Sequence, residues 1–162
     1  MKDAVREKFL KYGKLIEPFE IDGHRFDFFG EIQVKTVHTT FFLKDYEIIS
    51  YIYVLSKNVT LAKLSLFQEE FNVLKRLARK LLKTPEGHFL STFILLLETD
   101  RGELPEKEIR ELFFRKSLLF GLKGALQCAV VAVTQKGDKK VYPSEVEETI
   151  KWLYSELRVS RK

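Results

Sequence analysis

The chain has 162 residues, of which 45% are hydrophobic and 31% are charged, and this balance excludes an intrinsically disordered protein. The length fits one domain, because two halves would each be too small to bury a sizeable core. The single cysteine, Cys128, excludes an intramolecular disulfide framework and a cysteine-rich zinc site. We therefore predict one α+β domain over residues 1–162, with no cofactor and no metal.

The sequence carries no signal that is typical of a secreted or membrane protein. Residues 1–12 are too charged for a signal peptide, and the longest apolar run, around residues 93–97, is far shorter than the roughly 18 residues of a membrane span. We expect a cytoplasmic protein with no membrane contact. Two Asn and four Gln against 28 Lys and Arg and 23 Asp and Glu favour a thermophilic source. The net charge of +5 suits a polyanionic partner, and it also serves solubility alone.

The first third of the chain predicts a helix followed by an antiparallel meander. The helix covers residues 2–12 and ends at Gly13. Asp22-Gly23 is a strong hairpin signal, and Phe29-Gly30 indicates a bulge or bend in the next strand. Two further strands are expected over residues 41–43 and 46–55, which are rich in β-branched and aromatic side chains.

The centre of the chain predicts one long helix and one buried strand. Apolar residues recur at steps of three and four over residues 66–83, and Ser65 with Gln68 would form a capping box at the start. Residues 88–99 are nearly all apolar, so this strand should be buried on both faces of a sheet.

The last third predicts a short helix, three strands and a final helix. The short helix starts at Pro105, and the strands are expected over residues 117–121, 125–135 and 139–142. Ser144 and Glu147 would cap the last helix. Because strands come in runs, we predict an α+β fold with a mixed, mainly antiparallel sheet of about six to eight strands, packed by the 66–83 helix and by terminal helices.

Three short segments resemble an uncharacterised prokaryotic domain family of unknown function. They are residues 87–92 (Gly-His-Phe-Leu-Ser-Thr), the acidic segment 103–111, and the bend 120–124 (Phe-Gly-Leu-Lys-Gly). The resemblance spans most of the chain, and it implies no recorded chemistry.

A basic edge on the 66–83 helix is the first candidate binding site. Spacings of three and four place Arg76, Arg79, Lys80 and Lys83 along one solvated edge, which could neutralise several phosphates of a nucleic acid. The alternative is a solvated helix face whose cations suit the C-terminal end of the helix.

The second candidate is a nuclease-like set of Asp27, Glu31, Gln33 and Lys35. Alternation places the last three on one strand face, in an order similar to that of PD-(D/E)xK nucleases. Gln33 is a poor ligand for a divalent ion, and Glu31 comes two residues too early. The alternative is a polar sheet face with a Glu31–Lys35 pair.

The three histidines and the cysteine complete the search for chemistry. His24, His38 and His88 lack metal-ligand spacing, and a pairing of His88 with Ser91 lacks the surrounding elbow of a serine nucleophile. They read as ordinary strand-end or core histidines. Cys128 lies in an apolar strand, so we predict a buried and unreactive thiol.

Phenylalanine pairs indicate surplus apolar surface. Consecutive residues face opposite sides of a strand, so Phe28, Phe29, Phe41 and Phe42 cannot all face one core. Either a second helix layer covers the surplus or a two-fold homodimer does. With no convergent catalytic set, we rank a non-catalytic binding or interaction domain first, nucleic-acid binding second and a phosphodiesterase-type enzyme last.

Overall fold

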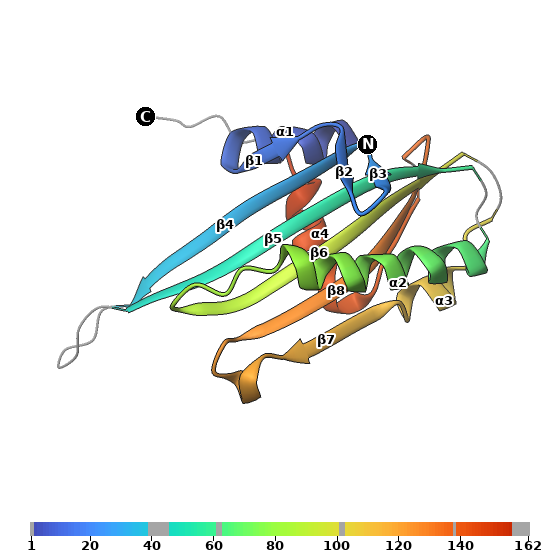
Figure 1. The fold of residues 1–162 in the computed structure, drawn as a ribbon. Coiled ribbons are helices and arrows are strands. Elements are labelled where there is room, and N and C mark those ends of the chain that lie inside the picture. The colour runs from blue at the N-terminus through green and yellow to red at the C-terminus, as the bar shows by residue number, and fades with distance from the viewer. Residues whose placement is uncertain (1, 39–45, 61–62, 101–102, 138, 157–162) are drawn as a thin grey trace.

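The structure is a computed structural model that describes residues 2–38, 46–60, 63–100, 103–137 and 139–156. It has an α+β fold built on a mixed seven-stranded sheet (Figure 1). The helices among the described residues are α1 (Lys2–Tyr12), α2 (Leu64–Leu81), α3 (Glu106–Arg110) and α4 (Glu147–Leu153), with short 3₁₀ turns at Leu119–Gly121 and Ser144–Val146. None of these helices is both long and apolar enough to cross a membrane.

The sheet has the strand order β1-β4-β5-β6-β8-β7, and the short β9 pairs with β8. Its central strands β5, β6 and β8 are parallel to one another, and the outer pairs are antiparallel. The hairpin of β2 and β3 stands apart, as Asp22-Gly23 predicts. The bounds are β1 (Lys14–Ile16), β2 (Phe19–Ile21), β3 (His24–Phe26), β4 (Phe28–His38), β5 (Tyr46–Val59), β6 (His88–Thr99), β7 (Phe113–Ser117), β8 (Ala125–Thr134) and β9 (Lys140–Val141).

Helices cover both faces of the sheet. One face packs against α2, and the other packs against α1 and α4 (Figure 1). Strand β6 shows the result, because Phe93 and Leu95 belong to the α2 layer while Ile94 and Leu96 belong to the opposite layer. The predicted burial of this strand on both faces is confirmed.

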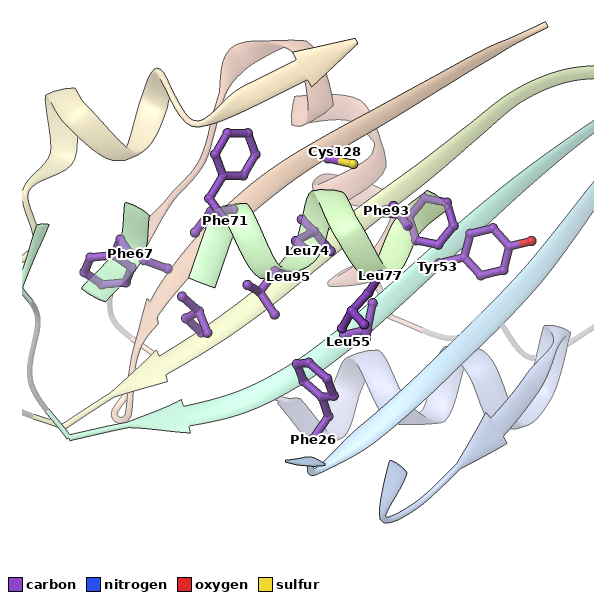
Figure 2. Packing of buried hydrophobic residues seen from close by; sticks show 14 of the residues in the cluster. Phe26, Tyr53, Leu55, Phe67, Phe71, Leu74, Leu77, Phe93, Leu95 and Cys128 are labelled. Carbon is purple, nitrogen blue, oxygen red and sulfur yellow. The ribbon is translucent and has the colours of Figure 1, made fainter. Parts of the chain in front are cut away.

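The core under α2 is rich in stacked aromatic rings. The ring of Tyr53 stacks on that of Phe93 at 4.3 Å between centroids. Figure 2 shows the Tyr53 hydroxyl pointing away from the leucine and phenylalanine side chains around α2. Cys128 lies in the same layer and is fully buried. Burial raises the pKa of its thiol to about 12, against the opposing influence of Lys75 and Arg79.

The structure contradicts several predictions about helix caps, a strand bulge and a strand end. Helix α2 begins after Lys63 without a side-chain cap, so Ser65 is already inside the helix, and Ser144 lies in a 3₁₀ turn rather than at a cap. Gly30 forms no bulge, because β4 runs through it in register with both neighbours. The strand expected over residues 117–121 is also wrong, because β7 ends at Ser117 and the chain then enters a tight turn.

The phenylalanine pairs divide between the two layers where the structure describes them. Phe28 is buried in the layer that holds α1 and α4, and Phe29 is buried on the opposite face, where the ring of Phe19 on β2 stacks on it at 4.6 Å. Both rings of this pair are buried inside the chain, so neither Phe28 nor Phe29 offers surface to a partner. Phe41, Phe42 and the strand expected over residues 41–43 lie outside the described residues.

Candidate functional site

Strands β1, β4 and β5 line up polar side chains on the α2 face of the sheet. Lys14 lies directly opposite Glu31, and Glu31 lies opposite Tyr53. Gln33 lies opposite Tyr51 in the next row. Directly opposed residues on a sheet face have neighbouring side chains. The strand register therefore gathers charged and phenolic groups from three separate parts of the chain.

These groups line a pocket of about 370 Å³ beyond the C-terminal end of α2. Its walls are Tyr12, Gly13, Lys14, Glu31, Gln33, Tyr51 and Lys83. Helix α1 supplies Tyr12, the turn after it supplies Gly13, and the segment after α2 supplies Lys83. Small-ligand sites are concave and carry a few convergent polar groups, and this pocket meets that description.

An ion pair between Lys83 and Glu31 is the main contact in the pocket. Lys83 Nζ donates a hydrogen bond of 2.7 Å to Glu31 Oε1. The Glu31 side chain is only 11% exposed, whereas that of Lys83 is 55% exposed. The carboxylate therefore forms the floor of the pocket and holds the ammonium group near its mouth. The same hydrogen bond raises the pKa of Lys83, so this side chain stays charged at neutral pH.

The tyrosines supply hydroxyl groups on the same side. Gln33 Nε2 donates a 3.2 Å hydrogen bond to the Tyr51 hydroxyl oxygen, which leaves the Tyr51 proton free for another acceptor. The Tyr53 hydroxyl is buried and has no hydrogen-bond partner of normal geometry among the described residues. Burial first, and the Glu31 carboxylate second, raise the pKa of Tyr53, so it remains a neutral phenol.

The polar row continues from Tyr51 to strand β6 through His88. The ring of His88 stacks on Tyr51 at 6.2 Å, and its Nε2 lies 2.7 Å from Ser91 Oγ. Its Nδ1 lies 2.6 Å from the carbonyl oxygen of Lys123. Because a carbonyl only accepts, Nδ1 carries a proton, and in the neutral ring the Ser91 hydroxyl donates to Nε2. His88 and Ser91 are buried, and the contact of His88 with Lys123 links β6 to the loop before β8.

The nuclease-like residues are separated by the fold. Glu31, Gln33 and Lys35 share the α2 face, whereas Asp27 lies in the bend before β4 and lines a different pocket with Arg6 and Arg25. The expected Glu31–Lys35 pair is wrong, because four residues along a strand span about 13 Å. Lys35 instead pairs with Glu47 on β5 at 3.4 Å. Within the described ranges, no three His, Cys, Asp or Glu side chains form a group that could hold a metal ion.

The basic edge of α2 is partly neutralised by the N-terminal strands. Lys80 forms an ion pair with Asp22 of the β2–β3 turn, and Lys83 pairs with Glu31. Arg76 and Arg79 are exposed, and neither forms an ion pair with a described residue. Of the four basic residues that the sequence places on one edge, Lys80 and Lys83 therefore neutralise carboxylates of the N-terminal strands, and the two arginines do not pair with any described carboxylate.

Sequence reasoning missed the pocket because its members come from distant segments. The sequence suggests that Lys83 belongs to a phosphate-binding edge of the helix, and nothing around Lys14, which follows Gly13, indicates a binding site. The alternation of Glu31 and Gln33 on β4 and of Tyr51 and Tyr53 on β5 could have indicated two polar rows, had the pairing of these strands been known.

Comparison with protein families identifies a match over most of the chain. A family model described as a domain of unknown function, DUF8052, matches residues 1–156. A comparison with curated proteins finds no match. The match confirms the resemblance to an uncharacterised family and covers almost the whole sequence. The chain therefore belongs to the DUF8052 family.

Proposed function

We propose that this chain is a non-catalytic binding domain and that the pocket beyond α2 binds a small anion with a carboxylate or phosphate group. The observation that carries the proposal is the donor set. Lys83 is held by Glu31 through one N–H, which leaves two ammonium protons, and Tyr51 has its own proton free. Lys14 adds a second cation that is exposed and forms no ion pair with a described residue.

The charges of the pocket support an anion over a cation. Lys14 and Lys83 carry two positive charges against the one negative charge of Glu31, so the lining has a net charge of +1. Glu31 positions Lys83 and reduces its freedom, and a preorganised donor loses less entropy on binding. Charge-assisted hydrogen bonds from ammonium groups to carboxylate or phosphate oxygens are stronger than neutral ones.

The test is isothermal titration calorimetry with inorganic phosphate and with acetate. We expect saturable binding to the wild type and a loss of about tenfold or more in affinity for Lys83→Met, which removes one charge-assisted bond. Lys107→Met is the matched control, because Lys107 is exposed on α3 and forms no ion pair with a described residue. Equal binding by both variants, or no binding by the wild type, would overturn the proposal.

Nucleic-acid binding along α2 is the second hypothesis, and it has different critical residues. Arg76 and Arg79 form no ion pair with a described residue, so their replacement by Gln should weaken binding to a duplex, and binding should also fall steeply with salt. The replacement of Arg76 and Arg79 should leave phosphate binding in the pocket unchanged. Duplex binding that is lost in this double variant and kept in Lys83→Met would favour the second hypothesis.

A further inference from the structure

A tight turn between β7 and β8 projects three apolar side chains into solvent. Leu119 is 63% exposed, Phe120 103% and Leu122 86%, which places them among the most exposed large apolar residues described. Phe89, which is 58% exposed, adjoins the turn at Gly124. Single exposed apolar residues are normal on protein surfaces, but a cluster on one short turn marks an interaction site.

The turn has a strained backbone and is closed by hydrogen bonds. Leu119 and Phe120 have φ values of 49° and 55°, a left-handed conformation that is costly for large side chains. Backbone hydrogen bonds from Leu118 to Gly124 and from Lys123 to Leu118 close the turn. A 2.6 Å contact between His88 Nδ1 and the Lys123 carbonyl oxygen also links the turn to β6. These contacts close the turn while its apolar side chains remain exposed.

Positive charge surrounds the apolar side chains. Arg115 and Lys116 on β7 and Lys123 in the turn are exposed, and none forms an ion pair with a described residue. The sequence has no Asp or Glu between Glu111 and Asp138. Glu86 is a nearby carboxylate among the described residues, and it shares a pocket with Lys123 and Leu122.

We propose that the turn 118–124 is an anchor that inserts into the surface of an anionic membrane. A bilayer takes protruding apolar side chains without a matching cavity, and its anionic headgroups attract flanking Lys and Arg. A protein partner would need a concave, acidic site that is complementary to this convex surface. Binding at the membrane surface requires no spanning helix, and it departs from the absence of membrane contact that the sequence predicts. The site is distinct from the pocket beyond α2.

Co-sedimentation with lipid vesicles tests the anchor. We expect the full chain to bind phosphatidylcholine vesicles that contain phosphatidylglycerol, and to bind pure phosphatidylcholine more weakly. Phe120→Ser and Leu122→Ser should each lower the partition coefficient by about tenfold to a hundredfold, the value of one buried large apolar side chain. Leu10→Ser on α1 is the matched control, because Leu10 is also 63% exposed, and it should bind as the wild type does.

Thermal unfolding of each variant shows whether it is folded, and exposed side chains should change the midpoint little. Replacement of Lys116 and Lys123 by Gln should weaken the preference for anionic vesicles, because only Arg115 of the three flanking cations remains. The proposal is overturned if the wild type binds neither vesicle, or if Phe120→Ser binds as well as Leu10→Ser. It is also overturned if light scattering shows a dimer that Phe120→Ser dissociates, since a second copy would then cover the turn.

Discussion

Replacing Gly30 with alanine tests how closely α1 packs on the sheet. The new Cβ would lie 2.4, 2.5 and 2.6 Å from Cγ, Cδ1 and Cδ2 of Phe9, whereas carbon atoms in contact normally stay about 3.5–4.0 Å apart. Phe9 is fully buried, so its ring has to move by about 1 Å within a packed layer. Overpacking of this kind costs about 1–3 kcal/mol.

The assay is urea unfolding followed by circular dichroism, with a thermal scan beside it. A loss of about 1–3 kcal/mol corresponds to a fall of about 2–12 °C in the unfolding midpoint for a chain of this size. In a double-mutant cycle, Phe9→Ala alone should cost about 3–5 kcal/mol, and Gly30→Ala should then cost almost nothing more. A neutral Gly30→Ala in the wild type, or additive losses in the cycle, would refute this account of the packing.

The remaining predictions concern the core and the ion pair in the pocket. Cys128 should react with a thiol reagent only after denaturation, because burial raises its pKa and hides the sulfur; rapid labelling of the native chain would contradict this. Leu74→Ala on α2 should lower the free energy of unfolding by about 2–5 kcal/mol in urea titrations, since Leu74 is fully buried. The pKa of Lys83 is raised above its ordinary 10.5 in the folded chain, so its contribution to stability is complete below that pH and is lost as the pH rises further. Above pH 10.5 the free energy of unfolding of the wild type should therefore fall more steeply with pH than that of Lys83→Met. Parallel curves of unfolding free energy against pH would contradict the ion pair.

Local patterns in the sequence predicted most of the helices and strands. The apolar repeat over residues 66–83 matches α2 within two residues, and the apolar run 88–99 is β6. These elements are encoded by periodicity within one segment, which a reader of the sequence can count. The helix caps at Ser65 and Ser144 failed because a capping motif is a weak signal that packing readily overrides.

The candidate sites were harder to predict because they depend on register between distant strands. The Lys83–Glu31 contact joins residues that are 52 positions apart. It forms because the side chain of Glu31 on β4 lies on the face of the sheet that α2 covers, and the segment after α2 places Lys83 beside it. The sequence predicts a strand over residues 117–121 and a bend over residues 120–124, and nothing local indicates that the apolar side chains of the turn at 118–124 point outward. The hydrogen bonds that close the turn, and the contact with His88, depend on residues that lie apart in the sequence.

The most direct test of the binding pocket is a two-dimensional amide NMR titration of the ¹⁵N-labelled chain with inorganic phosphate. The account predicts saturable shifts that share one dissociation constant at Gly13, Lys14 and Gln33, the amides that surround Lys83. The same titration of Lys83→Met should show these shifts only at much higher phosphate. Shifts confined to Arg76 and Arg79, or no saturable shift at the pocket, would contradict an anion site beyond the end of α2.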